Sequence, residues 1–520
     1  MYPKLGGAAL AGAVVALSLP PWGWWPLAFV GMGFLSLLLG GAPARARLSI
    51  GTAFGSGMFT VGLWWMGEFN VAGAGLAVAV EALFVGLAAA GCPPGRGRAI
   101  GFPAALVIAE ALRRVAPFGG LPLAGIALGQ VGGPLAGAAR IGGELILVAL
   151  VGIGGVAGAE LVRPGSGPRR ARTAGDADGS GQGHGAARTG LARRIPRARR
   201  EANAGGSRPE RRRAVAAIAL IAGVASTGAL APDGSPGRTV DIAAVQGGGP
   251  RGFRGVESNT EAVFAAQVAA GERVRPPVDL VLWPEDVIDV DGPIATTSEA
   301  QRVGAVARRL GATVVAGVVE DAGPTRFRNA AVVWSGRGEI VDRYDKVHRV
   351  PFGEYVPWRS MVDRLADLSV IPRDALAGRG PGIVSTSAGD AGVLISYEVF
   401  FAGRARTATG AGASVLLVPT NAASYSTTQV PTQEVAAARL RAIESGRDLV
   451  QAAPTGYSAF IDHRGRVLSR STLGRRQVIQ RKVVLRSGRT IYHRTGDWLL
   501  LGLAAFGLGA GWARSRKGDG

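Results

Sequence analysis

The stretch VDLVLWPE, residues 278–285, indicates the fold class, because it is a short apolar run that ends abruptly in a carboxylate. Further runs of the same kind lie on both sides of it: TVDIAAVQ (239–246), ATVVAGVVE (312–320), NAAVVW (329–334), AGVLISYEVFF (391–401), ASVLLVPT (413–420) and DLVQAAP (448–454). These runs are apolar on both faces, which is typical of strands that are covered on both sides of a sheet. The pattern predicts a set of buried β-strands.

Helical stretches alternate with these runs. SEAQRVGAVARRLG (298–311) and TQEVAAARLRAIESGR (432–447) are the clearest examples. Strands that alternate with helices in this way are typical of a single α/β domain. We therefore expect residues 232–496 to form one α/β domain.

Apolar segments flank this domain on both sides. A helix needs about 20 mostly apolar residues to cross the hydrocarbon core of a bilayer. Candidate spans lie near residues 6–20, 24–41, 49–67, 70–91, 99–115, 141–162, 213–231 and 497–514. We expect six transmembrane helices in residues 1–162, a seventh in 213–231 and an eighth, with a short tail, in 497–520. The predicted fold class is a multi-pass α-helical membrane bundle plus an α/β domain inserted before the last span.

Basic residues indicate how the bundle is oriented. Positive charge gathers in three of the loops between spans and in the tail, at Arg45, Arg47, Arg96, Arg98, residues 163–212, Arg514, Arg516 and Lys517. With both termini in the cytoplasm, all of these clusters lie on the cytoplasmic side, as the positive-inside rule requires. The α/β domain is then predicted to lie on the extracytoplasmic face.

Much of the formal net charge of +21 lies in one segment. Residues 163–213 hold fourteen arginines and four acidic residues, so they contribute +10. This low-complexity stretch cannot bury enough apolar surface to fold alone, so 163–212 is predicted to be a disordered cytoplasmic linker. A nucleic-acid-binding arm is the other interpretation, but the segment has no aromatic residue for stacking on bases. We expect attraction to anionic lipid and no nucleic-acid partner.

The only cysteine, Cys92, excludes an intramolecular disulfide and a cysteine-based zinc site. It lies in a predicted cytoplasmic loop, on the opposite side of the membrane from the α/β domain. No metal site and no cofactor are predicted.

Three residues suggest a catalytic set, because chemistry in α/β folds collects where strands end. Glu285 ends the run 278–285, Lys346 lies in DRYDKVHRVPFGEYVPW, and Ser396 is expected inside the apolar strand 391–401. Taken singly, each residue has a common structural explanation: Glu285 as a cap, Lys346 as a solvated loop residue and Ser396 as a small core residue. Together, a carboxylate base, an ammonium group and a hydroxyl form a complete apparatus for acyl transfer.

Longer motifs around these residues resemble a known family. The motifs are WPE (283–285), YDKVHRVPFGEYVP (344–357), SYE (396–398), PTNAASY (419–425), RLRAIESGRDLVQAAPTGYSAFIDHRGRV (439–467) and, in the apolar half, GGLPLAGIALGQVGGPLAGAARIGG (119–143). They are similar to motifs of the carbon–nitrogen hydrolase (nitrilase) superfamily, and in particular of its apolipoprotein N-acyltransferase family. The resemblance covers nearly the whole chain apart from the Arg-rich linker.

The resemblance implies a nitrilase-like αββα sandwich on a bundle of eight helices in the bacterial plasma membrane. The implied reaction moves an acyl chain from a phospholipid to the α-amino group of the diacylglyceryl-modified N-terminal cysteine of a lipoprotein. A monomer without a cofactor is expected. By motif, Glu285 matches the general base, Lys346 the oxyanion stabiliser and Ser396 the nucleophile position. Supporting active-site positions are Glu354, Tyr397 and Glu398.

One departure concerns the nucleophile, which is cysteine in the family and Ser396 here. A hydroxyl is much harder to ionise than a thiol, and the acyl-enzyme would be an oxyester. His348 is expected to be solvated and so adds no base. Three hypotheses follow: a serine-variant N-acyltransferase, a degenerate non-catalytic paralogue that binds lipid or lipoprotein, and a membrane-tethered amidase. The retained Glu285, Lys346 and Glu354 favour the first.

Overall fold

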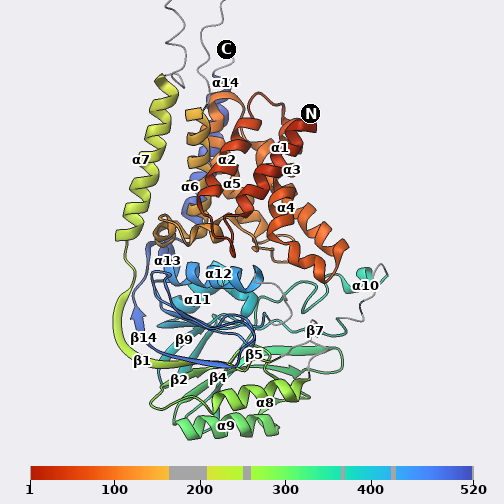
Figure 1. Cartoon of the computed structure of the whole chain (residues 1–520), viewed down its shortest axis with the longest axis vertical. Coiled ribbons are helices and arrows are strands. Elements are labelled where there is room, and N and C mark those ends of the chain that lie inside the picture. Colours follow the sequence, from red (N-terminus) through yellow and green to blue (C-terminus); the bar gives the residue numbers. More distant parts are fainter. Residues whose placement is uncertain are drawn as a thin grey trace, which may run out of the picture.

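The computed structural model describes residues 2–162, 208–249, 259–364, 368, 371–422 and 429–517. Nearly all of the predicted Arg-rich linker, residues 163–212, lies outside these residues. Figure 1 shows two parts stacked along the long axis of the molecule, a helical bundle above and an α/β domain below. The chain passes from the bundle into the α/β domain after α7 and returns to the bundle in α14.

The bundle has one long helix for each predicted span. Its helices are α1 (Tyr2–Ala16), α2 (Pro26–Leu38), α3 (Ala44–Gly62), α4 (Val71–Gly91), α5 (Arg98–Arg113), α6 (Ala139–Val162), α7 (Arg208–Leu230) and α14 (Trp498–Arg516). Among the described residues, three helical stretches are long and apolar enough to cross a membrane: Val71–Gly91, Ala136–Val162 and Arg211–Leu230. The count of eight spans stays a prediction.

Short 3₁₀ turns join the bundle helices: η1 (Trp64–Glu68), η2 (Gly95–Gly97), η3 (Ile126–Gln130) and η4 (Ala136–Ala138). Small residues bring α1 and α3 into backbone contact, since a Cβ atom at Gly12 would lie 1.9 Å from Phe54 O. Cys92 is buried directly after α4. Ser515, near the C-terminal end of α14, donates a hydrogen bond to Pro94 O. Cys92, two residues before Pro94, therefore lies at that end of the bundle, away from the α/β domain.

Two β-sheets form the centre of the α/β domain. The first has the order β14 (Gln477–Ser487), β1 (Ser235–Gln246), β2 (Leu280–Leu282), β4 (Thr313–Asp321), β5 (Arg326–Trp334) and β6 (Ile340–Asp345), with β3 (Ile288–Val290) on β4 and β7 (Asp374–Ala375) on β5. The second has the order β13 (Val467–Arg470), β12 (Ala459–Ile461), β11 (Leu449–Ala452), β10 (Val415–Pro419), β9 (Gly389–Val393) and β8 (Ile383–Thr386). Each predicted run overlaps one of these strands.

Four layers result, because both faces of each sheet are apolar and must be covered. Side chains of the two sheets share one core, in which Ile242 and Leu282 belong to the first sheet and Leu417 and Val450 to the second. The outer face of the first sheet is covered by α8 (Thr260–Gly271) and α9 (Ser298–Leu310), and η7 (Ile294–Thr296) precedes α9. The second sheet is covered by α11 (Ala402–Gly410) and α12 (Gln429–Ser445). The predicted αββα sandwich is confirmed.

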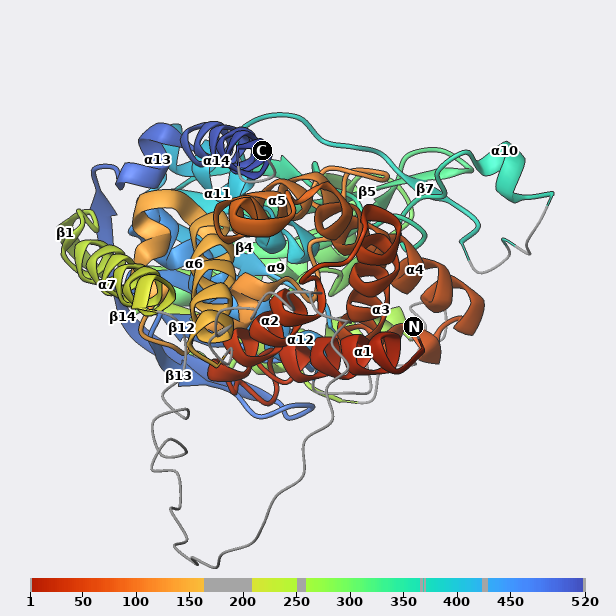
Figure 2. The same ribbon diagram turned by 90° about the horizontal axis from the view of Figure 1, so that it is seen from above.

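The helices α11 and α12 lie between the second sheet and the bundle in Figure 1, and Figure 2 shows from above that the bundle lies over the α/β domain. From α12, Gln429 Nε2 donates to Val61 O at 2.9 Å and Gln433 Nε2 donates to Gly62 O at 3.1 Å. The N–H of Ala124 donates to Gln433 Oε1 at 2.9 Å. The remaining short helices are α10 (Arg359–Val362), η8 (Ser396–Phe400) and α13 (Ile491–Thr495). Hydrogen bonds from α12 therefore join the α/β domain to the bundle.

Candidate active site

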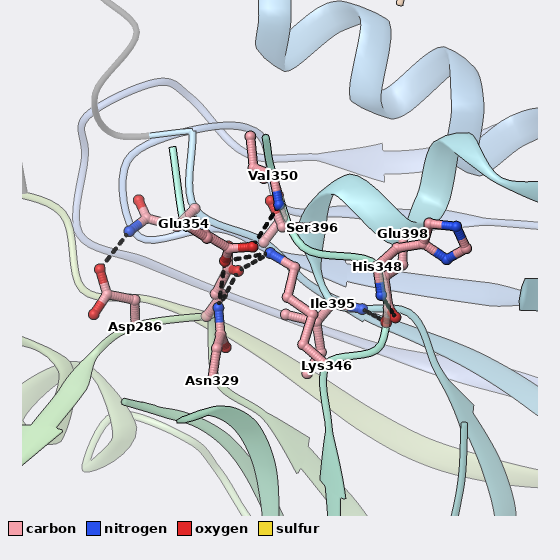
Figure 3. Close-up of polar contacts among 12 residues, drawn as sticks. Asp286, Asn329, Lys346, His348, Val350, Glu354, Ile395, Ser396 and Glu398 are labelled. Carbon is pink, nitrogen blue, oxygen red and sulfur yellow. Dashed lines mark hydrogen bonds and ion pairs between the residues drawn. The ribbon is translucent and has the colours of Figure 1, made fainter. Parts of the chain in front are cut away.

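Lys346, which follows β6 directly, is the centre of a buried ionic cluster. Its Nζ lies 2.8 Å from Glu285 Oε1 and 2.8 Å from Glu354 Oε1. The lysine is 2% exposed and Glu285 is 5% exposed. Figure 3 shows the carboxylate of Glu354 directed at the ammonium group of Lys346. Two of the predicted residues and one predicted supporting residue thus meet at the ends of strands of the first sheet.

The charge state of Lys346 follows from this geometry. Burial alone would lower the pKa of Lys346, but the charges and hydrogen bonds of Glu285 and Glu354 outweigh it and hold the pKa above its ordinary value. Lys346 is therefore an ammonium ion at neutral pH. Asn329 of β5 completes the cluster, since its Nδ2 donates to Glu285 Oε1 at 2.8 Å and to Glu354 Oε1 at 3.0 Å. The second oxygen of Glu354 accepts from the N–H of Val350 at 2.7 Å.

Ser396 does not lie inside a strand, so that prediction was wrong. Strand β9 ends at Val393, and Ser396 begins the 3₁₀ turn η8 with a left-handed φ of +49°. The turn forms because the buried carboxylate of Glu398 accepts the N–H of Ile395 at 2.9 Å and bends the chain back on itself. A non-glycine residue at positive φ is strained, and such strain is concentrated at functional sites. The turn places Ser396 beside Lys346 and Glu354 in Figure 3.

Glu398 positions the site and is wholly buried. Its carboxylate accepts four hydrogen bonds of 2.8–3.0 Å, from the backbone N–H groups of Val347, His348 and Ile395 and from the hydroxyl of Tyr344. Two of these donors follow Lys346 directly, and one precedes Ser396. Glu398 thus connects the loop after Lys346 to the turn that begins at Ser396.

Tyr397 points from the same turn toward the bundle. Its hydroxyl donates to Gly120 O at 2.8 Å, and its ring packs edge-on against Phe401 with centroids 5.1 Å apart. A second tyrosine makes a similar link, since the hydroxyl of Tyr355 donates to Phe118 O at 3.1 Å. The candidate site therefore lies on the side of the α/β domain that contacts the bundle.

Sequence reasoning missed three residues of the site: Asn329, Thr420 and Glu434. Thr420 Oγ1 lies 3.3 Å from Ser396 Oγ and 2.7 Å from Glu434 Oε1. Asn329 begins and Thr420 ends a predicted strand run, and a polar residue at the end of an apolar run is a signal that could have found them. Glu434 gave no such signal, because only the tertiary structure shows that α12 is buried.

His348 is not solvated, contrary to the prediction. Its ring is half-buried and stacks on Phe401 with centroids 4.1 Å apart. Burial, with the nearby positive charge of Arg404, lowers the pKa of His348. Its neutral ring acts as a packing surface for Phe401. Among the described residues, no group of three His, Cys, Asp or Glu side chains could hold a metal ion.

The arrangement has the parts that acyl transfer needs. Ser396 supplies a hydroxyl at a strained turn, Glu285 and Glu354 supply carboxylates, and Lys346 supplies a buried positive charge. A fixed ammonium group in a dry site stabilises a developing oxyanion far better than it would in water. This constellation supports covalent catalysis on an acyl group.

Two family models match the chain in its two halves. Residues 241–492 match the carbon–nitrogen hydrolase model, and residues 11–157 match the model of the apolipoprotein N-acyltransferase N-terminal domain. Together they cover the α/β domain and most of the bundle. The chain is also similar to the solved structure of Saccharomyces cerevisiae Nit3, a member of branch 10 of the nitrilase superfamily, at 20% identity and a TM-score of 0.38, over 49% of this chain and 92% of that one.

Full-length relatives match over both halves at once. The apolipoprotein N-acyltransferase of Allorhizobium ampelinum is 30% identical over 504 residues, which span 89% of this chain and 86% of that protein. The enzyme of the same name from Vibrio vulnificus is 25% identical over 540 residues, 98% of this chain and 97% of that protein. The chain therefore belongs to the apolipoprotein N-acyltransferase family, and it is an acyltransferase of the carbon–nitrogen hydrolase superfamily.

Proposed function

We propose that this enzyme transfers an acyl chain from a phospholipid to the α-amino group of the diacylglyceryl cysteine at the N-terminus of lipoproteins. The reaction passes through an acyl-enzyme intermediate on Ser396. The observation that supports this best is the buried cluster of Lys346 with two carboxylates next to a serine at positive φ. We expect the enzyme to act as a monomer without a cofactor or a nucleic-acid partner.

In the first half-reaction, Ser396 Oγ attacks the ester carbonyl carbon of the phospholipid. Glu285 acts as general base for the reaction, and the ammonium group of Lys346 stabilises the oxyanion of the tetrahedral intermediate. Glu354 and Asn329 hold Lys346 and Glu285 in place through their shared hydrogen bonds. The lysophospholipid leaves, and the acyl chain remains on Ser396 as an oxyester.

In the second half-reaction, the α-amino group of the lipoprotein attacks the oxyester. Donor and acceptor use the same site in turn, so ping-pong kinetics are expected. An oxyester is less activated toward an amine than a thioester, so the stabilisation of the second tetrahedral intermediate by Lys346 matters more here than with a cysteine nucleophile.

The apolar core of the molecule supports a lipid donor. One continuous cluster of buried side chains extends from the bundle into the nucleophile turn, where it includes Tyr397, Val399, Phe400 and Phe401. The candidate site thus lies where the apolar bundle meets the α/β domain. This placement suits a substrate whose ester is polar and whose chains are apolar.

Specific contacts disfavour one of the two other hypotheses. A degenerate paralogue has no need to keep Lys346 bonded to both Glu285 and Glu354 and bridged by Asn329. A membrane-tethered amidase would use the same residues on a different donor. Only the choice of substrate separates the amidase from the N-acyltransferase.

Mass spectrometry of a lipoprotein N-terminus tests the proposal. The chain is expressed in a bacterial strain that has lost its own N-acyltransferase, and a lipoprotein is recovered from the membrane. We expect a triacylated cysteine with this chain and a diacylated one with its Ser396→Ala variant at equal expression. A free α-amino group in both strains would contradict the proposal.

The proposed placement in the bacterial plasma membrane predicts that the α/β domain lies on the extracytoplasmic face. Reporter fusions after Val162 and at Gly323 should then report opposite sides of the membrane. Gly323 is suited to an insertion, because it lies in the turn between β4 and β5 at a φ of +99°. Both reporters on the cytoplasmic side would contradict the topology, and with it the access of lipoproteins to Ser396.

A further inference from the structure

Thr420 and Glu434 have no role in the mechanism above, yet they are connected to Ser396 by hydrogen bonds. Thr420 follows β10, and Glu434 lies in the first half of α12. Thr420 Oγ1 is 3.3 Å from Ser396 Oγ and 2.7 Å from Glu434 Oε1. Ser396, Thr420 and Glu434 are 9%, 0% and 3% exposed. They form a buried chain that starts at the nucleophilic hydroxyl and ends at a carboxyl group.

The direction of the hydrogen bonds in this chain depends on the charge of Glu434. A threonine hydroxyl carries one proton, so Thr420 cannot donate to both neighbours at once. When Glu434 is protonated, it donates to Thr420, and Thr420 donates to Ser396. When Glu434 is ionised, both bonds reverse, and Ser396 donates to Thr420. Only the second arrangement prepares the Ser396 oxygen for attack.

We propose that Thr420 and Glu434 form a proton relay that orients the hydroxyl of Ser396 and takes up its proton during acylation. This inference rests on the proposed function, in which Ser396 is the residue that becomes acylated. Glu434 acts through Thr420 and is a positioning residue and proton acceptor. The relay accepts the single proton that Ser396 loses in acylation, and Glu285 serves as the general base toward the α-amino group in the second half-reaction.

Acylation moves two protons along this chain of hydrogen bonds. Ser396 Oγ bonds to the ester carbonyl carbon as its O–H bond breaks, its proton passes to Thr420 Oγ1, and the original proton of Thr420 passes to Glu434 Oε1. The tetrahedral intermediate then collapses, and the bond between the carbonyl carbon and the glycerol oxygen breaks. Thr420 Oγ1 gives its proton to the leaving glycerol oxygen, which departs as an alcohol, and Glu434 returns its proton to Thr420 and becomes a carboxylate again.

The need for a second base follows from the nucleophile and from the contacts of Glu285. A hydroxyl is far harder to ionise than a thiol, so a serine depends on a base more strongly than a cysteine does. Glu285 Oε1 already accepts hydrogen bonds from Lys346 and Asn329. Within the described part of the chain, the hydroxyl of Ser396 has its side-chain hydrogen bond with Thr420 and not with Glu285.

The surroundings of Glu434 suit a group that changes its charge. Burial raises the pKa of Glu434 to about 8; its hydrogen bond with Thr420 and the charge of Lys346 lower it, and the charge of Glu285 raises it. Within the described part of the chain, Glu434 Oε2 is buried without a hydrogen-bond partner. The charged residues Arg441 and Glu444 of the same helix pair with each other instead. Glu434 therefore binds a proton at neutral pH and releases it as the pH rises through about 8.

A comparison of two nucleophiles tests the relay. Full-length enzyme in phosphatidylethanolamine vesicles is assayed for single-turnover acylation at position 396 between pH 6 and pH 10. Wild type is expected to accelerate with rising pH through about 8, because only the ionised Glu434 accepts the proton. Glu434→Gln keeps the shape and a bond to Thr420, yet it should lose about a hundredfold in rate above pH 8 and lose this pH dependence.

The Ser396→Cys background separates chemistry from structure. A thiol ionises near neutral pH without the relay, so Glu434→Gln should cost less than about threefold there. Thr420→Val should match Glu434→Gln in both backgrounds, and Thr420→Ser should retain the wild-type rate. Thr409→Val is the matched control, since Thr409 is buried in α11 but bonds to Ala405 O and His493. It should leave acylation unchanged.

The outcomes distinguish this proposal from the one on which it rests. Acylated wild type whose Glu434→Gln variant keeps the rate overturns the relay alone. An equal loss in the serine and cysteine backgrounds shows a structural role and also overturns the relay. Wild type that never becomes acylated, while Ser396→Cys does, overturns both the proposed function and the relay.

Discussion

Replacing Ser396 with alanine is expected to abolish the acyl-enzyme and to reduce acyl transfer by at least about ten-thousandfold, because a methyl group cannot form an ester with the donor. The measurement is mass spectrometry of the peptide that contains residue 396 after incubation with phospholipid. In the wild-type enzyme, the adduct should survive neutral hydroxylamine better than a thioester would. The side chain of Ser396 is small and 9% exposed, so alanine should leave the fold intact.

The Ser396→Cys variant tests the same position through a gain in acylation. It restores the nucleophile of the family at a position whose φ of +49° strains serine and cysteine alike. Since a thiol is more nucleophilic and ionises more readily, acylation should rise or stay level, and the adduct should become labile to hydroxylamine. A wild-type chain that binds phospholipid without becoming acylated, beside an acylated Ser396→Cys chain, would favour the degenerate paralogue.

Replacing Lys346 with methionine is expected to reduce the rate of acyl transfer by a hundredfold or more. The variant loses the positive charge that stabilises the oxyanion, while the length of the side chain is kept. It also leaves Glu285 and Glu354 buried without their shared cation, which should destabilise the fold by about 3–5 kcal/mol. Thermal unfolding in detergent and single-turnover kinetics measure the two effects separately.

A double variant separates catalysis from stability. Adding Glu354→Gln to Lys346→Met removes one of the two uncompensated carboxylates, so it should recover part of the stability but none of the rate. Lys482→Met is the matched control, since Lys482 pairs with Asp241 on the surface with a side chain that is 73% exposed. It should change neither quantity appreciably. A double variant with wild-type turnover would refute the role of Lys346.

Much of the fold could be predicted from periodicity and length. Each apolar run overlaps a strand, the stretches 298–311 and 432–447 overlap α9 and α12, and each predicted span corresponds to a helix. Strand β14 escaped prediction, because its sequence QVIQRKVVLRS mixes charged and apolar residues, and only Val483 and Leu485 of it are buried. It forms a strand because it pairs with β1 over nearly its whole length.

The sequence by itself predicted an α/β domain from its apolar runs. Its resemblance to the family predicted the αββα class and the candidate set of Glu285, Lys346, Glu354 and Ser396, because the motifs that carry the resemblance are local. Only the tertiary structure decided how these residues work together. Glu398 turns Ser396 out of its strand by binding donors from two separate loops. Thr420 and Glu434 meet Ser396 because α12 packs between the second sheet and the bundle. Such contacts depend on side chains that are far apart in the chain. The charge of Glu434 depends on its burial, which raises its pKa and which no local sequence pattern indicates.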